Sequence, residues 1–453
     1  MAIGRWKRAV RALFPPTMID SDLERLGPKS KDSISSDDDR FWRDNLPPCD
    51  ESQLIETQVE PPLFQFSVED LVKEVQIKLQ SVVTETIYIG SGANHFGLGM
   101  RLADDRALVV RISRYDVNSQ RLYRPTRDDA GVSRLERMVG AVEFEVAIYN
   151  TLRSDAEVKV SRLLFHRVPV RVTPNERHNH LMGRELFVFE KADGKHNVWP
   201  DNEDRNLKIL TQCAHMRAAL FNFCIPWDFA KSWLPQNSPN PKVFPTEIVP
   251  TREFAISFLS AKVEEMIKNE GDMIGWESDH NVVGPIAAKA KQSLLRVIPV
   301  ILPVEGDQNA FYRFVLEHDD FGIHNMTIND KQDVTSLFDW ETSHIVPAIL
   351  SDPRLTVWCD LAVDEEGNPI ISRLWEDMDN ERRSEFQGYA KHYWQILSER
   401  APEFISTVSA AKDARHVWFT LKAWRGNNPE GYFGDLGTWA DRRYKELKGV
   451  SRT

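Results

Sequence analysis

The feature that most constrains the fold of this chain is one polar stretch in its second half. From position 316 the sequence reads Leu-Glu-His-Asp-Asp-Phe-Gly-Ile-His-Asn, and the apolar pair Leu337 and Phe338 then leads to Asp339. The step from Asp320 to Asn325 suits a short loop that points both side chains at one centre. An apolar strand ending at Asp339 brings a second carboxylate to that centre.

Phosphoryl transfer requires this set of side chains. The attacking hydroxyl needs a carboxylate that accepts its proton and aligns it, and Asp320 fits that role. Mg²⁺ bridges the phosphates and takes oxygen ligands, usually one or two of them from the protein, which Asn325 and Asp339 can supply. The alternative is a polar surface loop with this spacing by chance.

Three strand-like stretches lie upstream of this loop. They cover residues 86–89, 97–102 and 107–112, with Gly90-Ser91-Gly92 after the first and Asp104-Asp105 after the second. Strand, glycine turn, strand, acidic turn, strand predicts an antiparallel meander. Further strands are predicted at 158–160 and 185–190, and Asp193-Gly194 is a turn signal between two lobes.

A helix is predicted from about Arg134 to Arg153. Its apolar stripe consists of Met138, Val142, Tyr149 and Leu152, and Glu145 falls on the same stripe. A carboxylate on a buried face needs a cationic partner, because an unpaired buried charge is costly.

Together these stretches resemble the aminoglycoside phosphotransferase and choline kinase-like family, in which His-Gly-Asp-Leu-x-x-x-Asn precedes Ile-Asp-Trp-Glu. The divergent fungal members look most similar, and Trp340-Glu341 after Asp339 indicates the small-molecule branch. The resemblance covers roughly residues 84–355. It implies an α+β, two-lobed protein-kinase-like fold: a small antiparallel β lobe, a larger mostly helical lobe, and ATP or GTP with Mg²⁺ between them.

The resemblance also implies roles for individual residues. Gly90, Ser91, Gly92 and Asn94 match the loop over the phosphates, where backbone N–H groups cradle anions. Arg111 matches the strand residue that holds the α- and β-phosphates, and Glu145 its helix partner, with a purely structural ion pair as the alternative. Backbone groups from Glu190 to Ala192 match the purine-reading hinge. His318 matches the residue that braces the catalytic loop, Asp320 the base, and Asn325 and Asp339 the metal ligands.

Two positions depart from the family pattern. Position 111 is Arg where kinases usually have Lys; a guanidinium stays charged and can hold phosphate bidentately. Position 319 is Asp where the family often has Gly, so two adjacent carboxylates compete for the role of base. The spacing to Asn325 favours Asp320, and Asp319 then points elsewhere, a cationic substrate being one option.

The predicted function is an ATP- or GTP-dependent, magnesium-dependent kinase acting on a hydroxyl of a small molecule, with an amine-bearing acceptor as one option. The alternative is a pseudokinase that binds nucleotide or acts as a scaffold. A protein kinase is disfavoured because no Ala-Pro-Glu segment follows Asp339, and an oxidoreductase because Gly90 and Gly92 lead into a strand. The side chains suited to an amine, or else to the core, are Trp227, Asp228, Trp233, Trp276, Glu277, Trp375, Glu376 and Asp377.

Composition narrows the partners and the compartment. The net charge of -11 disfavours nucleic acid, and no apolar run is long enough to span a bilayer. Four scattered cysteines favour a reducing, cytoplasmic location, whereas Arg5, Lys7, Arg8 and Arg11 leave a mitochondrial transit peptide open. The acceptor and the oligomeric state stay undetermined.

The chain divides into three predicted parts. Residues 1–62 read as a flexible extension, 63–192 as the nucleotide-binding lobe with one key helix, and 193–453 as the helical lobe with the catalytic loop. Order begins at a helix capped by Ser67, and two or three amphipathic helices cover 384–448.

Overall fold

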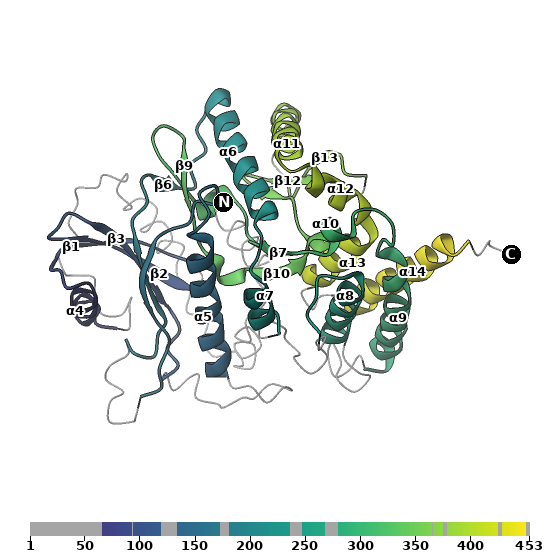
Figure 1. Cartoon of the computed structure of the whole chain (residues 1–453), viewed down its shortest axis with the longest axis horizontal. Coiled ribbons are helices and arrows are strands. Elements are labelled where there is room, and N and C mark those ends of the chain that lie inside the picture. The colour runs from purple at the N-terminus through teal and green to yellow at the C-terminus, as the bar shows by residue number, and fades with distance from the viewer. Residues whose placement is uncertain are drawn as a thin grey trace, which may run out of the picture.

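The computed structural model describes residues 66–92, 94–118, 134–172, 181–235, 247–267, 280–364, 366–374, 378–424 and 428–449. The predicted extension 1–62 and its basic segment lie outside these residues. Within them the chain forms a small lobe around one antiparallel sheet and a larger lobe rich in helices (Figure 1). The predicted two-lobed α+β arrangement is confirmed.

The small lobe is built on a five-stranded sheet in the order β1-β2-β3-β5-β4, with every neighbouring pair antiparallel. The predicted meander forms its first three strands. The strand bounds are β1 Val83–Ser91, β2 His95–Leu102, β3 Ala107–Ser113, β4 Leu163–Arg167 and β5 Leu186–Glu190.

Helix α4, Val68–Leu79, covers one face of this sheet. Its N-cap is Ser67, whose hydroxyl accepts a hydrogen bond from the Asp70 backbone N–H at 3.1 Å, as predicted. Leu71 and Val75 of α4 are fully buried in the cluster that contains the inward residues of β3. Each such side chain contributes about 1.5–3 kcal/mol to the free energy of unfolding.

Side chains alternate in direction along a strand, and this decides which residues lie on the face of the sheet away from α4. Val110 and Ile112 of β3 point toward α4, so Arg111 between them points the opposite way. In β5, Phe187 and Phe189 join α5, Arg134–Leu152, in the core of the larger lobe. The inner face of the sheet and α5 therefore share one hydrophobic core with the larger lobe.

The larger lobe consists mainly of helices that pack around a central pair of strands (Figure 1). Pro402 and Pro429 begin two of them, where a missing N–H costs no helical hydrogen bond. Helices α9 and α14 approach so closely that a Cβ on Gly437 would lie 2.9 Å from Ala290 Cα. The helix bounds are α6 Glu203–Asn222, α7 Trp227–Trp233, α8 Arg252–Met266, α9 His280–Ile301, α10 Gln308–Tyr312, α11 Asn380–Arg400, α12 Pro402–Ala410, α13 Lys412–Ala423 and α14 Pro429–Leu447.

Three small antiparallel sheets hold the loops of this lobe. They are β7 Phe314–Glu317 with β10 His344–Pro347; β6 Lys195–His196 with β8 Met326–Ile328 and β9 Val334–Leu337; and β11 Leu355–Thr356 with β12 Asp360–Val363 and β13 Pro369–Ser372. Gly194 makes the predicted turn at φ 115°, where a Cβ would collide with the carbonyl of Ile328. The chain thus passes from β5 to a strand of the larger lobe at this point, although the division into domains stays a prediction.

Some sequence predictions were wrong. Residues 158–160 form no strand of the small sheet; Val160 makes only an isolated parallel bridge to Leu337. The fifth strand is instead β4, whose Leu-Leu-Phe-His-Arg sequence lacks clean alternation. The described part of the larger lobe contains several strands besides the predicted one that leads to Asp339, because strands of two to four residues leave little periodic signal. Four helices, not two or three, follow residue 379.

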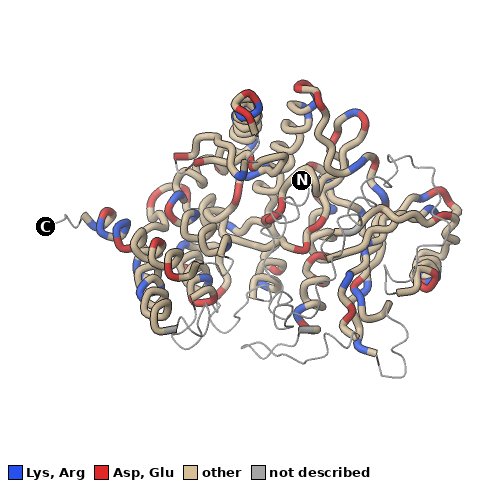
Figure 2. The backbone as a smooth tube through the Cα atoms, turned by 180° about the vertical axis from the view of Figure 1, so that it is seen from behind, with Lys and Arg blue, Asp and Glu red and all other residues tan. Residues whose placement is uncertain are grey.

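Charged residues are spread over both lobes rather than gathered on one. Lys and Arg alternate with Asp and Glu along the described chain (Figure 2). Among the described residues, no helix combines the length and the apolar character that crossing a membrane requires.

Candidate active site

The loop between β7 and β8 brings Asp320 and Asn325 together. Asn325 Nδ2 donates to the Asp320 backbone carbonyl at 2.9 Å and to its Oδ2 at 3.1 Å. A short 3₁₀ turn, Ile323–Asn325, closes the loop, with the Asn325 N–H donating to the Gly322 carbonyl at 3.0 Å. These two contacts fix the orientation of the Asn325 amide group. Its side-chain oxygen accepts no hydrogen bond from any described residue and is available as a ligand.

His318, the residue predicted to brace this loop, contacts the segment that follows β9, and its role stays a prediction. Its Nε2 lies 2.9 Å from the Phe338 carbonyl, and its ring meets Trp340 edge-on with centroids 4.7 Å apart. Burial lowers the pKa of His318, so the ring is neutral and Nε2–H is the donor. A neutral, buried imidazole suits the predicted structural role better than that of a proton carrier.

Asp339 stands beside Asn325 in a strained backbone conformation. The Phe338 N–H donates to the Asn325 carbonyl at 3.0 Å, which joins the end of β9 to the catalytic loop. Asp339 itself has φ 67° and ψ 58°, the left-handed region that non-glycine residues rarely adopt. Such strain persists where the surroundings impose it, and functional sites are where it concentrates.

Arg111 reaches from β3 to two carboxylates at once. Its Nη1 donates to Asp339 Oδ1 at 2.9 Å and its Nη2 to Glu145 Oε2 at 2.5 Å, while Phe187 lies 4.5 Å from its guanidinium carbon. Burial acts to lower the pKa of Arg111, but the two carboxylates outweigh it and the pKa lies well above its usual value. Burial raises the pKa of Glu145 to about 7, against the opposite pull of Arg111. The predicted Arg111–Glu145 pair is therefore present.

The predicted phosphate loop is the hairpin tip between β1 and β2. The Gly92 N–H donates to the His95 carbonyl at 2.9 Å, which closes the turn, and Gly90 and Ser91 end β1. Asn94 Nδ2 donates to Glu341 Oε1 at 2.9 Å, and His95 Nδ1 lies 3.4 Å from Glu341 Oε2. Glu341 thus holds the hairpin tip against the Asp339 segment.

The predicted hinge, Glu190 to Ala192, has fewer contacts that bear on its predicted role. The Lys191 N–H donates to the Ala107 carbonyl at 2.8 Å, and the Glu190 side chain pairs with Arg162 at 3.0 Å. Among the described residues, no hydrogen bond connects Glu190 or Ala192 to the catalytic loop. Their role as purine contacts stays a prediction.

His324 is a neighbour of the predicted base that sequence reasoning missed. Its Nε2 lies 2.9 Å from Asp320 Oδ2. Burial acts to raise the pKa of Asp320, but the hydrogen bond and charge of His324 outweigh it, so the pKa lies below its usual value. A histidine four residues after an aspartate, inside a loop with a tight turn, was the available signal.

Asp319 forms an ion pair within the chain. Lys422 Nζ lies 2.8 Å from each of its carboxylate oxygens, and His344 Nδ1 lies 2.8 Å from Oδ1. The chain itself supplies a cation for Asp319. Asp320, which contacts Asn325, has no such ion pair with Lys or Arg among the described residues, and its role as the base stays a prediction.

Oxygen donors of the right kind for Mg²⁺ meet at this site. Asn325 offers an amide oxygen, and Asp339 keeps Oδ2 outside its contact with Arg111. Across the described residues there is no cluster of three or more His, Cys, Asp or Glu that could hold a metal ion. Mg²⁺ usually takes one or two protein ligands and completes its shell with phosphate and water, and an amide oxygen and a carboxylate oxygen are ligands of the kind it prefers.

The residues predicted for an amine are divided. Trp233 packs against Phe144 with ring centroids 5.4 Å apart, which is a core position. Trp227, next to Asp228 on α7, is 44% exposed. The other five, Trp276, Glu277, Trp375, Glu376 and Asp377, lie outside the described residues.

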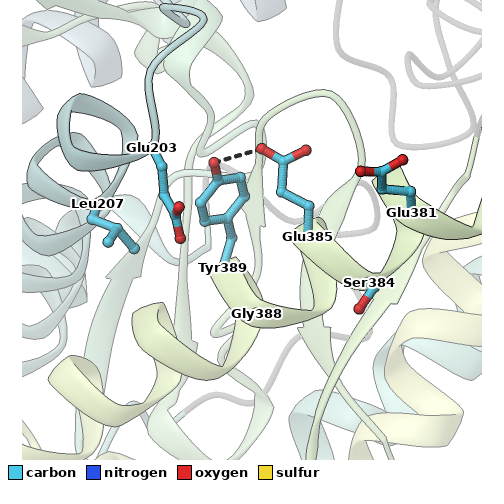
Figure 3. A pocket seen from close by; sticks show the side chains of 7 residues that line it. All are labelled: Glu203, Leu207, Glu381, Ser384, Glu385, Gly388 and Tyr389. Carbon is cyan, nitrogen blue, oxygen red and sulfur yellow. Dashed lines mark hydrogen bonds between the residues drawn. The ribbon is translucent and has the colours of Figure 1, made fainter.

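An open pocket of about 480 Å³ lies between α6 and α11, apart from the predicted residues (Figure 3). The Tyr389 hydroxyl donates to Glu385 Oε1 there at 2.7 Å. None of the predicted site residues discussed above lines this pocket. Its lining residues are Glu203, Leu207, Glu381, Ser384, Glu385, Gly388 and Tyr389.

Comparisons with known proteins give structural likenesses at low sequence identity. No family model and no curated protein matches the sequence. An aminoglycoside phosphotransferase solved with ADP and hygromycin B has a TM-score of 0.40 and 14% identity, over 85% of this chain and 100% of that one. An amicoumacin kinase solved with AMP-PNP and Ca²⁺ has a TM-score of 0.38 and 13% identity, over 85% and 95%.

A macrolide 2'-phosphotransferase from Brachybacterium faecium has a TM-score of 0.37 and 11% identity, over 83% of this chain and 98% of that one. These similar structures are kinases of small molecules by name. Likenesses of this size identify no substrate for the present chain. Its own site residues therefore have to carry the functional argument, and the resemblance to fungal members in particular stays a prediction.

Proposed function

We propose that this chain is a phosphotransferase that moves the γ-phosphoryl group of ATP or GTP, with Mg²⁺, to a hydroxyl of a small molecule. One observation carries the proposal: three hydrogen bonds, together with the peptide bond between Phe338 and Asp339, join the predicted base to the predicted phosphate-binding arginine. The path runs from Asp320 to Asn325, from Asn325 to Phe338, and from Asp339 to Arg111. A polar surface loop has no need of such a path into the opposite lobe.

Asp320 acts on the acceptor. Its pKa lies below the usual value, so it is ionised near neutral pH and can accept a hydrogen bond from the attacking hydroxyl. In the transfer, the bond from the γ-phosphorus to its bridging oxygen breaks and a bond to the acceptor oxygen forms. The hydroxyl proton passes to the Asp320 carboxylate. A weak base suffices because phosphoryl transfer depends more on alignment and charge stabilisation than on deprotonation.

Asn325 and Asp339 would hold the magnesium ion through their free side-chain oxygens. When bound, the ion neutralises charge on the phosphates. The left-handed backbone at Asp339 turns that side chain toward the site, and the contact with Arg111 restricts its rotation. Both ligands are thereby oriented before the nucleotide arrives, which lowers the entropy lost on binding.

Arg111 and the hairpin tip serve the phosphates from the other side. The guanidinium stays charged, and Glu145 and Phe187 fix its plane. Charge-assisted contacts from guanidinium to phosphate are among the strong hydrogen bonds in proteins. The backbone of Gly90 to Gly92, held over the site through Asn94, offers N–H groups for the same purpose.

The acceptor is the least determined part of this function. An amine-bearing acceptor rests on aromatic and acidic side chains, of which Trp227 and Asp228 on α7 are the exposed, described ones. A second candidate function is a nucleotide-binding regulator without turnover. It is favoured by Arg111, which occupies one oxygen of the metal ligand Asp339.

The test is thermal unfolding of the full chain with ATP or GTP, with and without Mg²⁺, followed by radiolabelled phosphoryl transfer to pooled alcohols, sugars and amino alcohols. A ligand at 100 times its dissociation constant stabilises the folded chain by about 2.7 kcal/mol, so the midpoint rises. We expect a Mg²⁺-dependent rise and transfer to at least one pool, both lost in Asp339→Ala. A rise without transfer or hydrolysis selects the regulator, and no rise at millimolar nucleotide rejects both.

A further inference from the structure

A closed cluster of three side chains holds the residue next to the proposed base. Lys422 of α13 and His344 of β10 both contact Asp319, at 2.8 Å in each case, and Lys422 Nζ lies 3.4 Å from His344 Nε2. The side chains are 20–28% exposed, so the cluster is half-buried. Lys422 is 103 positions from Asp319, and these contacts join the end of the chain to the catalytic loop.

The hydrogen-bond roles in this cluster are mutually consistent. Burial lowers the pKa of His344, so its ring is neutral. Nδ1–H then donates to Asp319, and the Nε2 lone pair accepts from the Lys422 ammonium. The cluster carries one positive and one negative charge, and each of its three side chains forms a hydrogen bond with the other two.

The cluster lies where it can restrict the movement of the loop. His344 pairs with Glu317 in the β7–β10 ladder, and Glu317 directly precedes His318. His344 also follows Glu341 by three residues. Asp319 is the residue between the bracing His318 and the base Asp320. Lys422 therefore anchors the loop at Asp319, while Asn325 anchors it at Asp320.

Removing the ammonium takes away the ion-pair partner of Asp319 and leaves the neutral His344 as its donor, beside the second carboxylate of Asp320. Two adjacent negative charges repel each other, and an unpaired charge seeks other donors. Two further donors, His324 and Asn325, bind the adjacent residue Asp320. Asp319 would compete for them and displace the base.

We propose that Lys422 is a positioning residue for phosphoryl transfer: by pairing with Asp319 it fixes the catalytic loop so that Asp320, and not its neighbour, faces the acceptor. This inference rests on the proposed function. It assigns a role to α13, which motif spacing alone would not connect with the site. It also explains how the chain accommodates an aspartate at position 319.

The experiment compares five full-length proteins: wild type, Lys422→Met, Lys422→Arg, the double variant Lys422→Met with Asp319→Asn, and the control Lys412→Met. Lys412 lies on the same helix and makes no ion pair with a described residue. The first measurement is hydrogen–deuterium exchange of the amides in peptides spanning 316–326, without ligand. The second is the rate of nucleotide turnover or transfer at saturating Mg²⁺ and nucleotide, together with the KM for nucleotide.

We expect Lys422→Met to speed amide exchange in the loop about tenfold, because the equilibrium constant for local opening of the loop rises by the same factor. Turnover should fall about 100-fold, the cost of a displacement near 1 Å, while the KM for nucleotide stays unchanged. Lys422→Arg and the double variant should restore both quantities most of the way, because the first keeps the cation and the second removes the unpaired charge. Lys412→Met should behave as wild type.

Two outcomes overturn the proposal. Loop exchange in Lys422→Met equal to that of wild type shows that the cluster does not hold the loop. Lys422 Nζ also lies 5.7 Å from the centroid of the Trp418 ring. Failure of the double variant to restore exchange shows that Lys422 acts through this contact instead of through Asp319. Should wild type turn over no nucleotide, the proposed function fails, while the exchange data still decide whether Lys422 fixes the loop. Should Lys422→Met not fold, the folded double variant provides the same comparison.

Discussion

Asn94 at the tip of the β1–β2 hairpin donates a 2.9 Å hydrogen bond to Glu341, which lies 247 positions further along the chain. This contact spans the two lobes at the point where the phosphates are expected. Glu341→Ala should weaken Mg²⁺-dependent nucleotide binding about five- to tenfold, because one hydrogen bond to a charged group is lost at the loop tip. Isothermal titration measures the change, and Glu341→Gln, which keeps an acceptor oxygen for Asn94, is the matched control. Equal binding by Glu341→Ala and wild type would remove Glu341 from the site.

Arg111→Lys should lower the free energy of unfolding by roughly 1–3 kcal/mol. A single ammonium cannot hold both Glu145 and Asp339 in the geometry that the two guanidinium nitrogens provide, so one buried carboxylate loses its partner. Urea unfolding monitored by tryptophan fluorescence gives the value. Arg101→Lys, at an exposed ion pair of the same sheet, should change it by less than about 0.5 kcal/mol. An Arg111→Lys variant as stable as wild type would show that the double contact is dispensable.

Asp320→Asn should keep nucleotide binding and lose about 10²–10⁴-fold in transfer rate, since the amide cannot accept the acceptor proton. The amide oxygen can still accept from His324 and Asn325, so the loop should keep its shape. A calorimetric titration with Mg²⁺–nucleotide, alongside the transfer assay, separates binding from chemistry. Normal transfer by this variant would mean that another group is the base.

Stability should fall as pH rises from about 5 to about 7, in part because of Glu317. Burial raises the pKa of this carboxyl to about 7, although Arg217 pulls it down; Asp352 and Asp319 add to the rise. The unfolded carboxyl titrates near about 4.3, so between these values the folded chain holds the extra proton and each pH increment favours unfolding. Chemical denaturation at several pH values measures the slope. Glu317→Gln should reduce it, whereas an unchanged slope would assign the effect to other groups.

Gly437→Ala should destabilise the chain by roughly 1–3 kcal/mol, because its methyl group would meet Ala290 at the contact of α14 with α9. Gly434→Ala, one turn earlier on the same helix, meets only Ile286 at 3.8 Å. It should stabilise by about 0.5–1 kcal/mol through helix propensity. Thermal unfolding of the pair tests whether close helix approach, and not helix propensity, sets the requirement for glycine at position 437.

Local patterns predicted the parts of the fold that have a strong period or a fixed spacing. The meander, the cap at Ser67, the helix carrying Glu145 and the loop from His318 to Asn325 all follow from such patterns. The strand bounds of β11 to β13 could not be predicted, because strands of two to four residues lie below the length at which alternation becomes visible.

Within the site, the residues that were missed are those whose role depends on distant partners. Lys422, His344 and Glu341 have ordinary sequence surroundings, and only folding brings them to Asp319 and Asn94. Glu145 was accessible because a carboxylate on an apolar helix face is unusual by itself. Polar residues that break a local pattern can be found from sequence, whereas those that fit their pattern cannot.

The shared core of α5 and the larger lobe has a mechanical consequence. Glu145 is carried by a helix that is part of the body of the protein, while Arg111 is carried by the sheet that α4 covers. Any shift of β3 against α5 therefore changes the Arg111–Glu145 separation directly. A spectroscopic ruler placed across this one ion pair would record such shifts.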